Sequence, residues 1–225
     1  MADIGWGNLT NSEGYGRLGD TKDDYKILTY DDAKVNYSTY MHGAHAMFYS
    51  THDFTLWDLY NTRAAILMQM RFDGLLGFPG GLIDQGEEDV VSGLNRELEE
   101  EIGLDLTRFC IKDENHLVSF LHEKKNLVLH FYAKEVSMIE FREIELKSLS
   151  APDFGSEVMG VIRPPLFTMG DGKRGLPAFL TNSFAGNARE ELVYAIRHLK
   201  LLTDTDLQES LKEFEELMKS KNSSE

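Results

Sequence analysis

The sequence predicts an α/β or α+β protein of one domain. Three observations favour this class. Segments typical of strands and of amphipathic helices follow one another along the chain without an internal repeat. The length of 225 residues suits one domain, and the 42% hydrophobic share is sufficient for a sizeable core. No apolar stretch approaches the ~20 residues that a membrane-spanning helix needs, so no membrane association is expected.

The charge balance restricts the classes of partner. With 38 acidic and 23 basic residues, the net charge is −15. This charge disfavours non-specific binding to nucleic acid or to anionic membranes, because phosphate contacts come from Lys and Arg. A small phosphorylated substrate, held by a few Arg and a cation, remains compatible with it. The single Cys110 and the absence of a secretory signal at the N-terminus favour a reducing compartment.

The first half of the chain begins with an extension, residues 1–35, that is partly irregular. Five of its residues are glycines within the first 19 positions. Apolar runs then predict strands at 44–49 and 63–71. The segment 74–81 is rich in glycine, and we expect a turn or a short strand there.

The segment 89–102 is the clearest helix. Its apolar residues recur at intervals of 3, 4 and 4, which forms one stripe: Val91, Leu94, Leu98 and Ile102. Acidic residues precede it, where the helix dipole favours carboxylates, and Gly103 follows as a C-terminal cap.

The second half continues the alternation. We expect strands at 117–122, 126–136 and 158–165, a surface loop at 171–175, and helices at 137–146, 187–201 and 205–220. Residues 36–203 form the predicted domain, and residues 204–225 an amphipathic C-terminal helix with a tail.

Three glutamates carry the chemistry. Glu97, Glu100 and Glu101 are spaced i, i+3, i+4, so they share one helix face, which lies beside the apolar stripe. Three like charges at the margin of a core repel one another unless a cation is present. Hard oxygen ligands of this kind suit Mg²⁺ or Mn²⁺. Taken alone, the cluster is equally compatible with a solvated acidic helix face.

The flanking residues favour the metal site. The pattern Arg-Glu-aliphatic-x-Glu-Glu-x-Gly at 96–103 has a chance on the order of one in a million per position, at ~7% usage of each named residue. With Gly81 and Glu87 upstream, the pattern resembles the Nudix box of hydrolases that act on nucleoside diphosphates linked to another moiety. Eight residues separate Glu87 from Arg96, where the usual form has seven. The role of Glu87 or Glu88 is therefore open.

The resemblance extends over about residues 40–200. The chain resembles the nucleolar Nudix enzymes that decap small nucleolar RNA and hydrolyse inosine diphosphates. The segments that carry this likeness are 65–74, 76–81, 93–97, 130–134 and 182–184. The resemblance implies a Nudix-type α/β/α sandwich around a mixed β-sheet, a homodimer, and a location in the nucleus (nucleolus and nucleoplasm) and the cytoplasm.

The resemblance also implies site residues. For substrate binding these are His45, Arg71, Phe78 and, where a glutamine is usual, Glu191. For the metal they are the backbone of Gly80 and the side chains of Glu97, Glu100, Glu101 and His122. Tyr194 replaces an acidic residue of the family, which leaves one metal position open.

Each of these residues has a structural alternative. His45 and Phe78 could belong to the core, Arg71 could form an ion pair, and Glu191 could be solvated on its helix. Glu191 is expected to accept a hydrogen bond from the N1–H of guanine or hypoxanthine, which adenine lacks.

The function implied is that of a metal-dependent hydrolase of capped RNA and of (deoxy)inosine diphosphate, in which Mg²⁺ or Mn²⁺ activates water. Either Glu100 or Glu101 takes a proton, and Glu157 is a further candidate base. Arg96 is expected to orient Glu100 by an i, i+4 contact. The alternative is a non-catalytic Nudix-fold partner of RNA or protein. A relative of the subfamily that acts in this way lacks the glutamates, and their presence here favours the enzyme.

Overall fold

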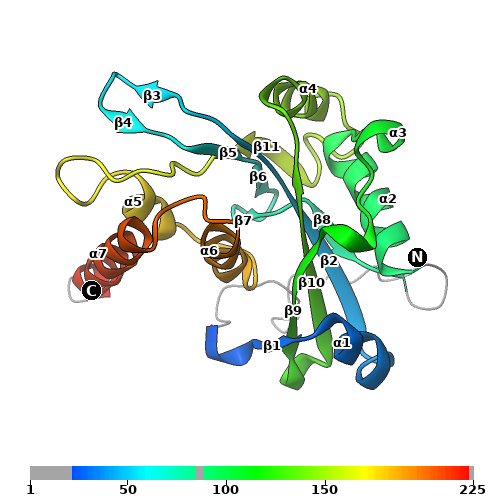
Figure 1. The fold of residues 1–225 in the computed structure, drawn as a ribbon. Helices are drawn as coiled ribbons and strands as arrows, with labels where there is room; N and C mark the ends of the chain where they lie inside the picture. The colour runs from blue at the N-terminus through cyan, green and yellow to red at the C-terminus, as the bar shows by residue number, and fades with distance from the viewer. Residues whose placement is uncertain (1–21, 85–88, 223–225) are drawn as a thin grey trace.

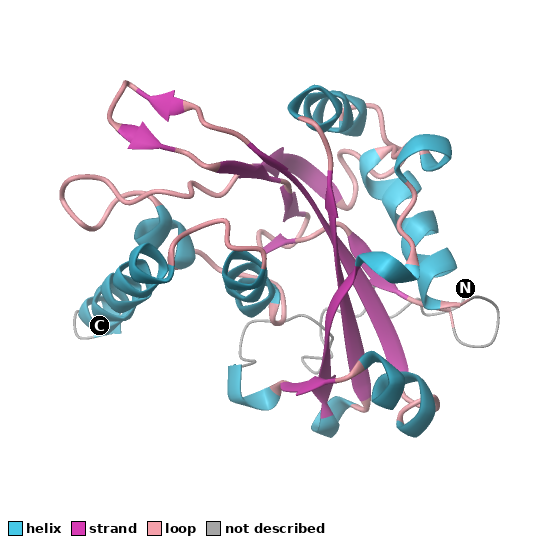
Figure 2. Ribbon diagram, in the orientation of Figure 1, coloured by secondary structure: helices cyan, strands magenta, loops and turns pink. Residues whose placement is uncertain are grey.

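The computed structural model describes residues 22–84 and 89–222 and has three layers. A twisted mixed sheet runs through the middle, with helices on both of its faces (Figures 1 and 2). Helices α1 (Tyr30–Asn36), α2 (Val90–Ile102), α3 (Leu106–Phe109) and α4 (Met138–Ser148) lie on one side. Helices α5 (Leu176–Leu180), α6 (Ala188–His198) and α7 (Asp204–Asn222) lie on the other. The predicted α/β sandwich around a mixed sheet is confirmed.

Strand β2 (Met41–Thr51) organises the large sheet. One of its edges pairs in parallel with β10 (Leu127–Glu135), from Met41 to Tyr49. Its other edge is shared between β8 (Gly80–Leu82) and β5 (Ala64–Ile66), both antiparallel. Strands β9 (His116–His122) and β1 (Lys26–Leu28) complete the sheet beyond β10. Because β8 pairs with the first half of β2, the Gly-rich segment lies at the centre of the molecule.

A second, smaller sheet contains β11 (Val158–Ile162), β6 (Met68–Arg71) and β7 (Leu76–Gly77). The segment predicted as one strand, 63–71, is therefore two strands in two sheets. The chain changes sheet at Leu67, whose N–H donates to the carbonyl of Phe48 at 3.0 Å. This break carries no sequence signal, because residues on both sides of it are buried and apolar.

Helix α2 confirms the predicted stripe and C-terminal cap, and it also has an N-cap. Leu94, Leu98 and Ile102 are fully buried in a cluster with residues of β2. The Asp89 side chain accepts from the N–H groups of Val91 and Ser92, each at 3.0 Å. Gly103 adopts the left-handed conformation with φ of 61°. The helix that carries the glutamates is thus fixed at both ends and along one face.

The opposite face of the sheet packs against α6 and α7 in one apolar cluster. Residues Leu207, Leu211 and Phe214 of α7 join it. Several elements escaped prediction because they are too short for a periodic pattern. They are α1, α3, α5, the strand β1, the hairpin strands β3 (Thr55–Leu56) and β4 (Tyr60–Asn61), and the 3₁₀ turns η1 (Lys22–Asp24) and η2 (Asp113–Asn115). The turn η3 (Glu123–Lys125) lies between the predicted strands 117–122 and 126–136. Among the helices of the described residues, none is long and apolar enough to cross a membrane.

Candidate active site

A pocket that opens to solvent lies where β2, β8 and the loop before α6 meet. It contains three of the four residues predicted to bind substrate. Its lining is Gly43, His45, Arg71, Gly77, Phe78, Gly80, Gly81, Leu82, Leu127, Leu129 and residues 185–188. The pocket therefore joins an apolar wall to a Gly-rich floor and one guanidinium group.

Arg71 and Phe78 take different places in the pocket. Phe78 is 3% exposed, and its ring packs on Phe131 with centroids 4.8 Å apart. The Arg71 guanidinium donates to the Asp73 carboxylate, at 3.0 Å from Nη2. A Cβ added to Gly77 would approach Arg71 Cδ to 3.3 Å, so the glycine gives the arginine its room. Phe78 offers an apolar contact, and Arg71 offers a charge that suits phosphate.

His45 is backed by a buried carboxylate. Its Nδ1 lies 3.5 Å from Oε1 of Glu191, whose side chain is fully buried on α6. Neither carboxylate oxygen of Glu191 has a hydrogen-bond partner among the described residues, and neither does the Nδ2 of Asn187 one turn earlier. The alternative of a solvated Glu191 is wrong. Glu191 does not line the pocket itself, so its effect reaches the pocket through His45.

Glu101 is the most constrained of the three glutamates. It is 4% exposed, and its Oε2 accepts from the N–H of Gly80 at 2.7 Å. Gln69 Nε2 donates to both of its oxygens at 3.1 Å. Burial disfavours the charged form and raises the pKa of Glu101 to about 8. Gln69 was not predicted, although a polar residue inside the apolar run 64–70 is a signal that could have identified it.

Two adjacent glycines allow this approach. Gly80 has φ of 131°, and a Cβ there would lie 2.1 Å from the carbonyl oxygen of Ala44. A Cβ on Gly81 would lie 2.8 Å from Glu97 Oε2. The carboxylates of Glu97 and Glu101 therefore lie against consecutive residues of β8, directly beneath the pocket floor.

Arg96 holds the other two carboxylates. Its Nη1 lies 2.8 Å from Glu97 Oε1 and 2.9 Å from Glu100 Oε2. The predicted i, i+4 contact with Glu100 is confirmed, and Glu97 shares it. Burial raises the pKa of Glu97 in spite of the arginine.

The donor set fits a divalent cation, although no three His, Cys, Asp or Glu side chains within 22–84 and 89–222 are gathered as a ready-made site. The pKa values of Glu97 and Glu101 are raised mainly by burial and further by neighbouring carboxylates. A bound cation offsets both the burial of the charged carboxylates and their mutual repulsion. Oxygen donors of this kind are the ligands that Mg²⁺ and Mn²⁺ prefer.

His122 lies away from these glutamates. It shares one face of β9 with Val118 and Phe120, which belong to the apolar cluster on the face opposite α2. Its ring packs edge-on against Tyr25, with centroids 5.0 Å apart. The structure thus gives His122 a packing role and does not bring it together with the glutamates. Tyr194 likewise stacks on His198 at 5.6 Å.

Glu157 lies on a loop that is tied to the site. The Asp153 N–H donates to the carbonyl of Glu100 at 3.0 Å, and the Phe72 N–H donates to the carbonyl of Glu157 at 2.9 Å. Burial, followed by Asp153, raises the pKa of Glu157, and its charge also acts on Glu97. Glu157 is therefore well placed as a candidate base. The upstream candidates Glu87 and Glu88 lie outside the described residues.

Comparison with known proteins shows the family to which this chain belongs. Residues 42–202 match the family described as Nudt16-like, U8 snoRNA-decapping enzyme-like. A U8 snoRNA-decapping enzyme of Homalodisca vitripennis is 48% identical over 176 residues, which cover 78% of this chain and 94% of that protein. The human Tudor-interacting repair regulator protein is 37% identical over 171 residues, 76% of this chain and 79% of that protein.

Among solved structures, a mutT/nudix family protein from Listeria innocua aligns with a TM-score of 0.48 at 16% identity, over 71% of this chain and 94% of that one. The family match spans the whole pocket and helix α2, together with all three glutamates. The chain therefore belongs to the Nudt16-like, U8 snoRNA-decapping enzyme-like family of Nudix hydrolases.

Proposed function

We propose that this protein is a metal-dependent hydrolase that removes the 5′ cap from RNA and cleaves (deoxy)inosine diphosphate. The observation that carries the proposal is the placement of Glu97 and Glu101 against the Gly80–Gly81 backbone, beneath the pocket. The similarity to decapping enzymes supports the choice of substrate.

Glu97 and Glu101, with Glu100 beside them, would hold Mg²⁺ or Mn²⁺, assisted by the backbone of Gly80. The bound cation supplies charge neutralisation at the diphosphate and a lowered pKa for a water molecule. Arg96 fixes the orientation of Glu97 and Glu100 through two hydrogen bonds. Arg71 holds a phosphate group, and Asp73 keeps the guanidinium in place.

The base that takes the proton from water is Glu100, Glu101 or Glu157. Glu157 has the advantage of lying on a separate loop, so it can accept a proton without giving up a metal contact. Its raised pKa brings it closer to neutral pH, where a general base is most effective. Glu101 has the disadvantage that both of its oxygens already accept hydrogen bonds.

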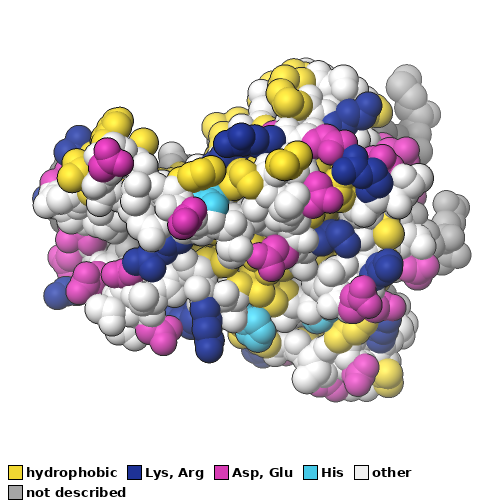
Figure 3. Space-filling model, turned by 45° about the horizontal axis from the view of Figure 1, so that its top comes forward, with side chains coloured by type: hydrophobic (Ala, Val, Ile, Leu, Met, Phe, Trp, Pro, Cys, Tyr) yellow, Lys and Arg dark blue, Asp and Glu magenta, His cyan; other side chains and the backbone are white. Residues whose placement is uncertain are grey.

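A non-catalytic binding protein is the competing function. The similarity to Tudor-interacting repair regulator proteins favours it. The three glutamates favour the enzyme, above all the buried Glu101, because a buried carboxylate is costly and a metal-free binding protein has no use for it. On the face drawn in Figure 3, basic side chains are interspersed with acidic ones. This distribution suits recognition of a cap in the pocket better than binding of a long RNA.

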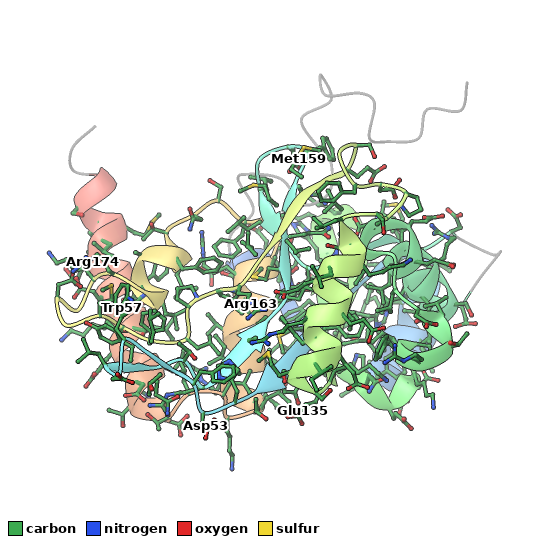
Figure 4. The ribbon with its side chains drawn as sticks, turned by 90° about the horizontal axis from the view of Figure 1, so that it is seen from above. Asp53, Trp57, Glu135, Met159, Arg163 and Arg174 are labelled. Atoms are coloured by element: carbon green, nitrogen blue, oxygen red, sulfur yellow. The ribbon has the colours of Figure 1, made fainter. Side chains whose placement is uncertain are left out.

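A homodimer in the nucleus and cytoplasm is part of the proposal. The β3–β4 hairpin extends away from the body and exposes three apolar side chains: Phe54 (52%), Trp57 (67%) and Leu59 (73%). Figure 4 shows Trp57 at one end of the molecule, the same end at which Arg174 lies. Pairing of two copies would cover these side chains. A molar mass of one chain, 25.6 kDa, in light scattering would contradict the dimer.

The test of the proposed function is a substrate panel with Mg²⁺ and with Mn²⁺. It compares capped RNA, inosine diphosphate and nicotinamide- or flavin-capped dinucleotides. We expect release of a nucleoside phosphate that stops on addition of a chelator. Binding of these ligands without turnover under any condition would favour the non-catalytic alternative.

Glu101→Gln is expected to lower turnover of the preferred substrate by at least about a hundredfold, because the amide binds a divalent cation poorly. The matched control is Glu99→Gln, an exposed position on the same helix. Steady-state kinetics of the two variants, with circular dichroism to verify folding, decides the case. A folded Glu101→Gln protein with near-normal activity would remove the metal assignment.

The metal-free protein is expected to lose stability as the pH rises from about 5 to 8. Glu101 has an ordinary pKa of 4.5 when unfolded and about 8 when folded. Between these values only the native state retains the proton, so stability falls by at most about 1.4 kcal/mol per pH unit. Urea unfolding of wild type and Glu101→Gln in chelator measures the difference. The variant should lack this loss of stability between pH 5 and 8. If the free energy of unfolding changes with pH in the same way in both proteins, the raised pKa of the buried Glu101 is contradicted.

His45→Ala is expected to raise KM more than it lowers kcat, because His45 lines the pocket and is not among the glutamates. Initial rates over a range of inosine diphosphate concentrations measure both constants. A large loss of kcat at unchanged KM would instead place His45 in the chemical step.

Glu191→Gln is expected to reduce the preference for hydrolysis of inosine diphosphate over adenosine diphosphate. Glu191 acts on the pocket through His45, because its carboxylate favours the imidazole tautomer with the proton on Nδ1 and leaves Nε2 as an acceptor. The N1–H of hypoxanthine or guanine can donate to such an acceptor, whereas N1 of adenine cannot, a difference of about tenfold in wild type. Parallel hydrolysis assays of the two diphosphates give the ratio. An identical ratio in wild type and variant would show that Glu191 does not affect the base preference.

A further inference from the structure

Gln69 is a buried polar residue in an apolar setting. It lies on β6, the central strand of the smaller sheet, and is 1% exposed. Its neighbours Met68 and Met70 point toward the apolar cluster of α6 and α7, so Gln69 points the other way, toward α2. An amide in such a place is costly unless it is hydrogen-bonded.

Among the described residues, the Gln69 side chain hydrogen-bonds to Glu101 alone. Nε2 lies 3.1 Å from each oxygen of the carboxylate. Gln69 Oε1 accepts no hydrogen bond from the described residues, so the carboxylate alone sets the orientation of the amide. When Glu101 is ionised, a turned-over amide would place Oε1 against the carboxylate oxygens, which repel it.

The donors to Glu101 are both uncharged. Gln69 Nε2 and the N–H of Gly80 hold the carboxylate in place from two strands. A lysine or arginine at the same position would pair with the carboxylate and cancel its charge. An apolar residue would leave the carboxylate free to rotate. The amide fixes the orientation and brings no positive charge that would compete with a cation.

We propose that Gln69 is a positioning residue, which holds the Glu101 carboxylate ready for a divalent cation without neutralising it. This inference rests on the proposed function, since it assumes that Glu101 binds a metal. Groups that orient a metal ligand from behind typically contribute 10–100-fold to metal affinity. A residue that only fills space and satisfies a buried group would contribute to stability and not to affinity.

The experiment uses the full chain and Mn²⁺ alone, without substrate. Titration calorimetry measures Mn²⁺ affinity, and urea unfolding in chelator measures the stability of the metal-free protein. Gln69→Met removes the donor at similar volume, and Gln69→Lys replaces it by a cation. The control is Asn95→Met on α2, whose amide, among the described residues, bonds to the backbone at Val91 and Ile111 and not to a glutamate.

We expect Gln69→Met to bind Mn²⁺ at least about tenfold more weakly than wild type. Gln69→Lys should bind it more weakly still, while its metal-free form is at least as stable as that of Gln69→Met, because the ammonium pairs with Glu101. Asn95→Met should lose stability and retain its Mn²⁺ affinity within about twofold.

Wild-type Mn²⁺ affinity in both Gln69 variants would overturn the inference and leave the proposed function intact. If Gln69→Met does not fold, Gln69→Lys decides alone, since wild-type affinity with a buried lysine beside Glu101 contradicts the role proposed for Gln69. If wild type itself binds no Mn²⁺ and hydrolyses nothing on the panel, the proposed function fails, and this inference fails with it.

Discussion

The hydrogen bond from the N–H of Gly80 to Glu101, at 2.7 Å, is the contact on which the site depends. It joins β8 to α2 and forms at the floor of the pocket. It exists because Gly80 lies so close to Ala44 of β2 that a side chain there would collide with the backbone. The sheet register, the helix and the pocket therefore share one constraint, which is the absence of a Cβ at one position.

The burial of Glu101 lowers the stability of the metal-free fold at the site where the chemistry occurs. Glu101 is buried, and its carboxylate is held by neutral donors in place of a cation. The metal-free fold stabilises this group poorly, since burial disfavours its charge. The buried apolar stripe of α2 and the two caps of the helix offset that cost. A helix with weaker packing would relax and move Glu101 away from β8.

Sequence reasoning identified what is periodic or rigidly spaced. The stripe and C-terminal cap of α2, and the three glutamates on it, follow from local spacing alone. It failed where contacts between residues far apart in the sequence determine the structure. The change of sheet at Leu67 depends on Phe48, 19 residues earlier in the chain. The hydrogen bonds of Gln69 depend on Glu101, 32 residues later. The side of the sheet that His122 faces depends on strand pairing, and Glu191 reaches His45 from a helix more than 140 residues later.

The acidity of the chain makes metal and substrate depend on each other. A net charge of −15 repels a diphosphate, and Arg71 is the cationic side chain among the described residues that line the pocket. Its charge is already shared with Asp73. Beneath the floor lies Glu97, whose negative charge adds to the repulsion, and Glu101 adds its own charge once it releases its proton. A phosphate group therefore enters favourably only when these carboxylates hold a cation, and a bound phosphate in turn supplies oxygen ligands that strengthen the hold on the cation. The same carboxylates that disfavour substrate in the metal-free protein thus make its binding conditional on the ion that performs the reaction.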